Sequence, residues 1–387
     1  MIRLLIAPDS FKGSLTSVEV AAALADGWSR ARPGDELRLA PLSDGGDGLL
    51  DAVQAAGGWR PWTVPAHDPI GRGISARFLR AAADGGRAVV EMAEASGLAR
   101  VAPVDRDPLG ASTFGTGQLL AGAVEAGCRD IVLGLGGSAT NDGGTGLLRA
   151  LGARFLDEAG AELRSGGAAL AGLAHVDLSR LPATLAEVSL TVASDVANPL
   201  LGATGAAATY GPQKGASPAQ VRRLEAALTR YAEVLEAAVG RPLRDTPGAG
   251  AAGGTGFGLL AIADRWRSFA VRPGVEVVME LTGFDTALAT VELVLTGEGR
   301  VDAQTAHGKT ALGVARRARA AGVRCLCFAG GATPEGIRVL AEAGAIVVPV
   351  SEAPGTVEAA MAAGAAPLAR AAERTAGLIG LLPQTRT

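Results

Sequence analysis

The chain has 387 residues, with 36 Lys and Arg against 39 Asp and Glu, and 48% of its residues are hydrophobic. Two or three domains are expected, because a domain usually takes roughly 100 to 200 residues. The formal charge of −3 gives no basic footprint of the kind that nucleic-acid-binding proteins carry, so we expect small-molecule partners and no nucleic acid. The 55 Gly residues are about twice the usual share of ~7%, which indicates a globular protein rich in glycine loops.

The sequence carries no sign of export or membrane insertion. The apolar run before Pro8 is shorter than the roughly 7–15-residue segment of a secretory signal, and no stretch approaches the ~18 apolar residues of a membrane span. Cys128, Cys325 and Cys327 are odd in number and show no CxxC spacing, so we predict buried thiols. We therefore expect a cytoplasmic protein.

Apolar runs of strand length recur along the chain, and several are continuous, as strands buried in parallel sheets are. We predict strands at residues 2–7, 36–40, 87–93, 130–136, 189–194, 291–297, 324–330 and 345–351. Segments with helical spacing lie between them, such as 17–31 and 219–239. Strands that alternate with helices predict an α/β fold.

Both ends of the chain carry strand–helix units. We predict that residues 1–75 and 285–387 together form one Rossmann-like parallel-sheet domain. Residues 76–284 would then be an inserted α/β domain. We expect the ligand-binding cleft between the two domains, where small-molecule sites often lie.

Lysine is rare in this chain, which has 33 Arg but only three Lys, at positions 12, 214 and 309. Each of the three stands next to a Gly. A compact ammonium on a flexible stem differs from a planar guanidinium in how it reaches a phosphate. We therefore predict that these lysines serve an anionic ligand; ordinary solvated lysines are the alternative.

The loop 7–17 follows the first predicted strand and opens a helix. Such a loop places backbone N–H groups and the positive end of the helix dipole at one point, which favours anions. Its candidate ligand-binding side chains are Asp9, Ser10, Lys12 and Ser14. Helix capping by Thr16 or Ser17, with Glu19 in the first turn, is compatible with this role.

Two later loops, 42–48 (LSDGGDG) and 133–146 (LGLGGSATNDGGTG), place acidic residues among glycines. Glycine lets the backbone approach a ligand closely, and carboxylates can hold Mg²⁺ or the hydroxyl groups of a substrate. Residues 134–139 also satisfy the GxGxxA dinucleotide fingerprint, so an NAD-dependent dehydrogenase is an alternative. Against it, Asp142 would put a carboxylate near the pyrophosphate.

Two further segments follow predicted strands. Gly308-Lys309-Thr310 ends like a P-loop, but Ala303 stands where the first P-loop glycine should be, so a P-loop NTPase is not predicted. The surrounding segment 296–310 is dense in charged groups for a mere connection. Asp195, at the carboxyl end of the strand at 189–194, is a candidate general base or Mg²⁺ ligand, with a helix cap as the alternative.

These loops occur in one order along the whole chain: APDSFKGSLT (7–16), PLSDGGDG (41–48), HDPIGR (67–72), GLGGSATNDGG (134–144), DVANPL (195–200), GPQKGA (211–216), GAGAAGG (248–254) and LTGEGRVDAQTAHGKT (295–310). Together they resemble the bacterial glycerate kinase family of type I. Asp47 departs from the family pattern, in which Glu is common at that position.

The resemblance implies ATP-dependent phosphorylation of D-glycerate, usually at the 2-hydroxyl, with Mg²⁺ and a two-domain α/β fold. A kinase that phosphorylates the 3-hydroxyl is the alternative, followed by a hydroxy-acid dehydrogenase and a hydroxy-acid-binding protein. The oligomeric state stays open.

Phosphoryl transfer requires positioning and charge neutralisation more than covalent chemistry by the protein. On the resemblance we predict Asp195, Lys12 and Lys309 as catalytic residues. The predicted substrate-binding residues are Arg72, Ser138, Asn141, Asp142 and Arg300. The predicted ATP-binding residues are Ser10, Gly13, Lys214, Gly253, Gly254 and Glu298. Asp195 and Asp44 are the predicted Mg²⁺ ligands.

Overall fold

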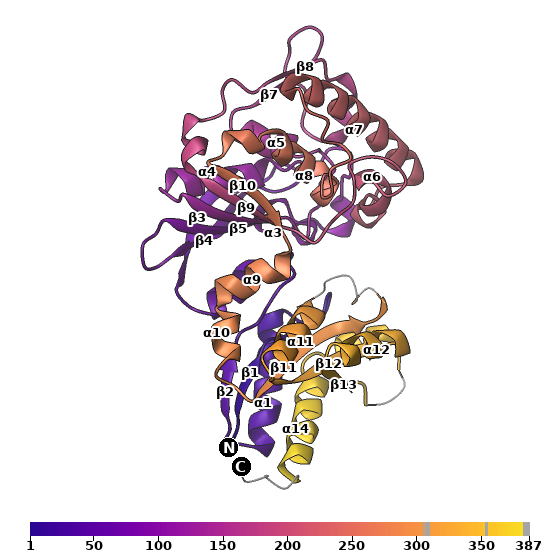
Figure 1. Ribbon diagram of the computed structural model, residues 1–387. Helices are drawn as coiled ribbons and strands as arrows, with labels where there is room; N and C mark the ends of the chain where they lie inside the picture. The colour runs from indigo at the N-terminus through magenta and orange to yellow at the C-terminus, as the bar shows by residue number, and fades with distance from the viewer. Residues whose placement is uncertain (304, 306–309, 353–354, 382–387) are drawn as a thin grey trace. The chain divides into compact units, whose positions relative to one another are not determined.

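The computed structural model describes residues 1–303, 305, 310–352 and 355–381 (Figure 1). The chain folds into two compact units. Unit 1 comprises Met1–Asp44, Asp51–Gly57 and Pro273–Thr387, and unit 2 comprises Gly45–Leu50 and Gly58–Arg272. Both ends of the sequence therefore contribute to unit 1.

The sheet of unit 1 is parallel throughout, and over the described residues it has five strands in the order β13-β12-β11-β1-β2 (Figure 1). Its strands are β1 (Arg3–Ile6), β2 (Glu36–Leu39), β11 (Leu293–Val301), β12 (Arg324–Ala332) and β13 (Ala345–Pro349). The strand order reverses between β1 and β11. In open α/β sheets such a reversal opens a crevice at the carboxyl ends of the strands, where ligands bind.

The helices of unit 1 cover this sheet. They are α1 (Ser17–Ala31), α9 (Gly274–Thr282), α10 (Phe284–Leu288), α11 (Thr310–Ala320), α12 (Pro334–Glu342), α13 (Val357–Ala362) and α14 (Ala366–Leu381), while α2 (Leu49–Ala55) is divided between the units. Trp28 of α1 packs into a core with Leu4 and Phe328. Gly27 allows α1 to lie directly on α14, because a Cβ there would stand 1.9 Å from the carbonyl oxygen of Ala369.

Unit 2 has a mixed sheet, which over the described residues has six strands in the order β10-β9-β6-β5-β4-β3. Its strands are β3 (Trp59–His67), β4 (Gly73–Ala81), β5 (Arg87–Glu91), β6 (Asp130–Gly134), β9 (Ser189–Ala193) and β10 (Ser268–Arg272). The last four run parallel, whereas β3 and β4 form an antiparallel hairpin at one edge. A separate ribbon joins β7 (Arg154–Leu156) to β8 (His175–Asp177).

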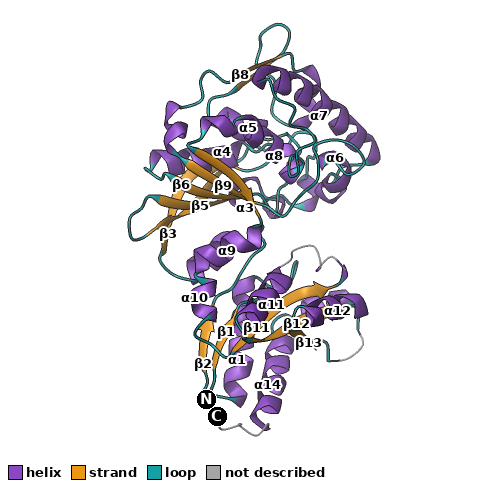
Figure 2. Cartoon of the chain, viewed as in Figure 1, coloured by secondary structure: helices purple, strands orange, loops and turns teal. Residues whose placement is uncertain are grey.

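The helices of unit 2 are α3 (Ala93–Ser96), α4 (Phe114–Glu125), α5 (Thr145–Ala150), α6 (Ala206–Tyr210), α7 (Pro218–Val239) and α8 (Ala251–Ala261). Helix α5 packs against both α4 and α8 (Figure 2). Tyr231 of α7 makes edge-to-face contacts with Phe155 and Phe257 in the core. The carboxyl ends of β5, β6, β9 and β10 meet at one edge of the sheet, because these strands are parallel.

The predicted α/β fold is confirmed, and all eight predicted strands are present within a few residues of their predicted ends. The three cysteines are buried thiols, as predicted. The hairpin β3/β4 and strand β10 were not predicted. Pro61 and Pro65 lie in β3, which tolerates them because it is the edge strand of its sheet.

The predicted domain boundaries, at 75/76 and 284/285, differ from those of the units. Residues 59–67 and 73–81 pair with each other and then with β5, which places them in unit 2. Helix α9 falls in unit 1. None of the helices in the described part of the chain is long and apolar enough to cross a membrane.

Candidate functional site

Unit 1 gathers polar side chains at the carboxyl ends of its central strands. Lys12 follows β1, and its Nζ lies 3.0 Å from Oδ2 of Asp44, which follows β2. The Lys12 side chain is 78% exposed, so the ammonium is open to a ligand. The charge of Asp44 raises the pKa of Lys12, which keeps this amine protonated.

Asp9 lies at the centre of this group and is buried. Its carboxylate accepts hydrogen bonds from the hydroxyl of Thr310 at 2.6 Å and from the backbone N–H of Ser10 at 2.6 Å. Burial and the negative charge of Asp44 together raise the pKa of Asp9 to about 7. The carboxylates of Asp9 and Asp44 repel each other, and a bound cation would favour the ionised form of both.

The loop after β1 is closed by hydrogen bonds within its own backbone. The N–H groups of Ser14 and Leu15 both bond back to the carbonyl of Phe11, which closes residues 11–15 into a tight turn. Gly13 lies in this turn at φ +79°, in the left-handed region that favours glycine. Helix α1 begins directly afterwards with a capping box, in which Thr16 and Glu19 satisfy each other's backbone N–H groups.

The end of β11 brings further charged residues to the same edge of unit 1. Glu298 is buried within β11, and its Oε2 accepts a hydrogen bond from the hydroxyl of Thr305 at 3.4 Å. Arg300 is largely exposed and its Nε lies 3.0 Å from Oδ2 of Asp302. Lys309, predicted as a catalytic residue, lies outside the described residues.

In unit 2, the two glycine loops singled out in the sequence pack against each other. A Cβ on Gly136 would lie 2.0 Å from the Cα of Gly46, and a Cβ on Gly134 would lie 2.6 Å from the carbonyl oxygen of Gly45. Glycine at these positions thus serves backbone-to-backbone contact. The GxGxxA segment is covered by residues 45–46, where a dinucleotide would need open backbone, which argues against the dehydrogenase alternative.

Glu91 is a buried carboxylate at this sheet edge that the sequence analysis did not single out. It ends β5, is buried, and accepts hydrogen bonds from the N–H groups of Gly48 and Leu50, both at 2.9 Å. Burial raises its pKa to about 7, against the effect of these two hydrogen bonds. Its position at the carboxyl end of a predicted strand was the available signal, as it was for Asp195.

Asp142 is fully buried and shapes the loop after β6. Its carboxylate accepts hydrogen bonds from the N–H and the hydroxyl of Thr113 and from the N–H groups of Gly144 and Gly146, at 2.9–3.1 Å. Burial raises its pKa despite these donors. The oxygen atoms of Asp142 are therefore occupied inside the unit, where they fix the loop.

The neighbouring residues of this loop are also enclosed. Asn141 is fully buried and donates through Nδ2 to the carbonyl of Pro108 at 3.2 Å. Its Oδ1 and the hydroxyl of Thr140 are buried without a hydrogen-bond partner among the described residues. Ser138 is half-buried at the start of the loop, so it is the more accessible of the predicted substrate-binding residues here.

Lys214 is buried, contrary to the expectation for a residue that contacts ATP phosphates. It is 2% exposed, and its Nζ donates to the carbonyl oxygen of Thr140 at 2.6 Å. Burial lowers its pKa to about 7, while the charge of Asp142 opposes that shift. In this structure the ammonium is directed into unit 2.

Gly253 and Gly254 lie in the first turn of α8, where the backbone departs from helical geometry. Both have positive φ angles, as does Ala252 at φ +52°, which is the one such non-glycine residue in the described part of the chain. A Cβ on Gly253 would stand 2.0 Å from the carbonyl oxygen of Thr140, which is also the acceptor of Lys214. Both glycines are buried, so they support the loop after β6 from behind.

Arg72 and Asp195 are both exposed in unit 2. The Arg72 guanidinium forms an ion pair with buried Asp68 and donates to the carbonyl of Arg100 at 3.0 Å. Asp195 follows β9 directly, at the same sheet edge as Glu91 and Ser138.

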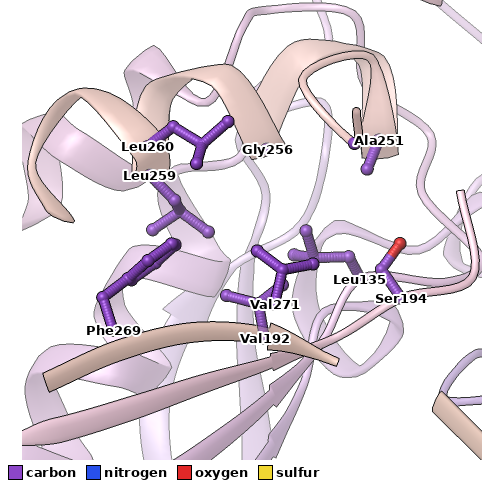
Figure 3. A pocket seen from close by; sticks show the side chains of 10 residues that line it. Leu135, Val192, Ser194, Ala251, Gly256, Leu259, Leu260, Phe269 and Val271 are labelled. Carbon is purple, nitrogen blue, oxygen red and sulfur yellow. The ribbon is translucent and has the colours of Figure 1, made fainter. Parts of the chain in front are cut away.

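A small cavity lies between the sheet of unit 2 and α8 (Figure 3). Its volume of about 10 Å³ is roughly that of one water probe, so it has no room for a nucleobase or a glycerate molecule. Its lining is apolar apart from Ser194 and includes Leu135, Val192, Leu259, Phe269 and Val271. We interpret it as a packing defect of the core.

Among the described residues, no group of three or more His, Cys, Asp or Glu side chains is arranged to hold a metal ion. A nucleotide-bound Mg²⁺ needs fewer protein ligands, because one or two carboxylates and the phosphates supply its oxygen atoms. The carboxylates of Asp9 and Asp44 beside Lys12 fit such a site.

Comparison with known proteins gives one consistent result. A family model described as the glycerate kinase family matches residues 4–380. The curated glycerate kinase of Halalkalibacterium halodurans is 44% identical over 330 residues, which are 85% of this chain and 86% of the relative. The curated glycerate 2-kinase of Escherichia coli is 41% identical over 318 residues, which are 82% of each chain.

A solved structure assigned as a glycerate kinase 2 from Salmonella typhimurium LT2 has the same fold. Its TM-score is 0.81 at 38% identity, and the match covers 98% of both chains.

Proposed function

The chain belongs to the glycerate kinase family, and from this premise we propose that it transfers a phosphoryl group from ATP to the 2-hydroxyl of D-glycerate, giving 2-phosphoglycerate and ADP. The observation that carries the proposal is the family match over residues 4–380, together with the 41% identity to a curated glycerate 2-kinase. Because the phosphate donor is ATP, we also propose that the enzyme works in the cytoplasm.

We propose that the carboxyl edge of unit 1 binds the phosphates of ATP. The exposed ammonium of Lys12 lies in the turn at residues 11–15, just before a 15-residue helix whose dipole adds positive potential. Ser10 and Arg300 supply further donors at this edge. Lys309 retains its proposed role from the family resemblance.

Within unit 1, Mg²⁺ would be held by the carboxylates of Asp44 and Asp9. When bound, the ion neutralises charge on the phosphates during transfer. Glu298, buried in β11, contributes negative charge at this edge and raises the pKa of Lys12 together with Asp44 and Asp9.

We propose that the loops at the carboxyl edge of unit 2 bind glycerate. Glycerate offers a carboxylate and two hydroxyl groups, which need a cationic side chain and short polar groups. Arg72 and Ser138 are the accessible candidates, and Asn141 and Asp142 fix the loop that carries Ser138. The backbone of Gly45 and Gly46 covers the GxGxxA loop, so a dinucleotide could not bind there, whereas the rest of this edge could bind a small substrate.

In the reaction, the 2-hydroxyl oxygen of glycerate forms a bond to the γ-phosphorus as the bond between that phosphorus and the leaving oxygen of ADP breaks. The hydroxyl proton passes to a base, for which we propose Asp195. Its exposed position after β9 leaves the carboxylate accessible to a hydroxyl group.

The test is ADP release by the purified enzyme with ATP, Mg²⁺ and D-glycerate, coupled to a reporter reaction. We expect release that depends on D-glycerate and is absent with a hydroxy acid that lacks the second hydroxyl, such as lactate. Asp195→Asn should lower kcat by on the order of 10²-fold or more while the protein stays folded. Glycerate-independent ADP release, or none from folded wild-type enzyme, would refute the proposed function.

A further inference from the structure

The two described lysines occupy opposite environments. The Lys12 side chain is 78% exposed, whereas Lys214 is 2% exposed. A chain that uses Arg 33 times and Lys three times has thus kept a lysine at a fully enclosed position. A buried ammonium is costly unless its surroundings pair it, so this placement calls for a function.

The backbone around Lys214 fixes where its side chain points. Residues 212–214 form a short 3₁₀ turn, and the N–H of Ala216 bonds back to the carbonyl of Gly211. Gly215 follows at φ +96°, and Ser217 then begins α7 with a capping box. The stem of Lys214 therefore starts from a rigid turn, and its ammonium ends 2.6 Å from the carbonyl oxygen of Thr140.

The carbonyl of Thr140 is held on two sides and so fixes the loop at residues 138–144. Lys214 holds it by a hydrogen bond, and the backbone of Gly253 closes on it so tightly that a Cβ would lie 2.0 Å away. Two residues further on, the carboxylate of Asp142 is fixed by four hydrogen bonds. These contacts hold the backbone of the loop, and Ser138 at its start is half-buried at the sheet edge.

We propose that Lys214 is a positioning residue for glycerate, which fixes the loop at residues 138–144 through the carbonyl of Thr140 and makes no contact with ATP. The inference rests on the proposed function, since it assigns that loop to the glycerate site. It replaces the expectation that the lysine of the GPQKGA segment binds nucleotide phosphates.

The chemistry of the position explains why it is a lysine. An ammonium has three N–H groups on a thin stem, whereas a guanidinium is a wide planar fork. The hydroxyl of Thr140 and Oδ1 of Asn141 are further buried oxygen atoms of the same loop, and neither has a hydrogen-bond partner among the described residues. A methionine would leave the Thr140 carbonyl without this hydrogen bond.

The first experiment measures amine reactivity in the wild-type enzyme, by acetylation with a water-soluble reagent and peptide mass spectrometry. We expect Lys12 to react rapidly and to be protected by ATP. Lys214 should react at least tenfold more slowly, and ATP should leave its rate unchanged. Rapid labelling of Lys214 that ATP prevents would overturn the proposal, because the amine would then be at the nucleotide site.

The second experiment separates the two substrates kinetically. In Lys214→Met we expect the KM for glycerate to rise by on the order of tenfold to a hundredfold, since small displacements of positioning groups have effects of this size. The KM for ATP should stay within about twofold. Gly253→Ala perturbs the same carbonyl from its other side and should give the same pattern, with Lys12→Met as the matched lysine change that acts on ATP instead.

An unchanged KM for glycerate in a folded Lys214→Met enzyme, checked by thermal melting, would contradict the inference. If neither loop variant folds, the labelling of the wild-type enzyme still decides between a buried amine and one at the nucleotide site. Failure of the proposed function itself is distinguishable, because wild-type enzyme would then show no glycerate-dependent turnover while Lys214 remained unreactive.

Discussion

Three buried carboxylates, Asp9, Glu91 and Asp142, lie at the end of a strand or in a loop that follows one. Burial raises the pKa of each, and hydrogen bonds from backbone N–H groups or hydroxyls oppose that rise. Their partners differ, because Asp9 lies beside charged Asp44, whereas Glu91 and Asp142 hold loop backbones. Buried carboxylates therefore serve two purposes: Asp9 adds negative charge beside Asp44 and Lys12, whereas Glu91 and Asp142 hold loop backbones.

Glu91→Gln tests the loop-holding task through the pH dependence of stability. The folded-state pKa of about 7 lies above the ordinary 4.5, so the contribution of Glu91 to stability is full below pH ~4.5 and is lost as the pH rises through 7. The variant lacks this titration. The stability of wild type relative to Glu91→Gln should therefore fall by roughly 3 kcal/mol between pH 4.5 and 8 in urea unfolding.

Glu19→Gln is the contrast for that experiment. Hydrogen bonds from Thr16 hold the pKa of exposed Glu19 below its ordinary value, so its contribution is present at neutral pH and is lost on acidification. The two variants should thus differ from wild type with opposite pH slopes. A pH-independent difference between wild type and Glu91→Gln would show that the buried carboxyl does not titrate as described.

Lys12→Met tests the charge at the phosphate edge of unit 1. Removing a donor aimed at a transferring phosphoryl group should lower kcat by on the order of 10²-fold, with a weaker affinity for ATP. Arg30→Met removes a cation from the exposed face of α1 and should leave turnover unchanged. Steady-state kinetics in ATP decides the matter; equal kcat values for Lys12→Met and wild type would exclude Lys12 from catalysis.

At the scale of elements, the sequence predicted the central parallel strands and helix α1, and it missed the hairpin β3/β4. Continuous apolar runs such as LLIA and LVLTG identified the central parallel strands, and α1 begins and ends at its predicted residues. The hairpin β3/β4 was not predicted because its edge strand, β3, buries few residues and contains two prolines. It therefore has no continuous apolar run. The local signal was weak where the strand pairs on one side only.

The predicted N-cap of α1 gives a test at this scale. The hydroxyl of Thr16 accepts a hydrogen bond from the N–H of Glu19, and the Glu19 carboxylate accepts one from the backbone N–H of Thr16. Thr16→Ala removes the hydroxyl that accepts from Glu19 and should lower the free energy of unfolding by about 1 kcal/mol. Val18→Ala, an exposed change two residues on, should stay within about 0.5 kcal/mol of wild type.

If thermal and denaturant unfolding showed Thr16→Ala and Val18→Ala to be equally stable, the cap would not anchor the loop at residues 7–16. That loop carries Ser10, Lys12 and Gly13, so its anchoring also bears on ATP binding.

At the scale of the whole molecule, the motifs that carry the resemblance occur in both units, and most of them lie on loops that follow strands. Sequence reasoning located these loops, because strand ends and glycine clusters are local features. It could not tell a side chain that meets the ligand from one that points inward. Lys12 and Lys214 have the same glycine neighbourhood in the sequence, yet only the packing of residues 138–144 shows that Lys214 is buried.

The central claim is that this enzyme phosphorylates the 2-hydroxyl of D-glycerate, and the most direct measurement is proton-coupled ³¹P NMR of the product formed from ATP and D-glycerate. The account predicts a phosphomonoester doublet, because phosphorus at the 2-position couples to a single carbon-bound proton. A triplet would place the phosphoryl group on the CH₂ oxygen at the 3-position and contradict the proposed substrate orientation. Absence of any new phosphomonoester signal from folded enzyme would contradict the kinase assignment itself.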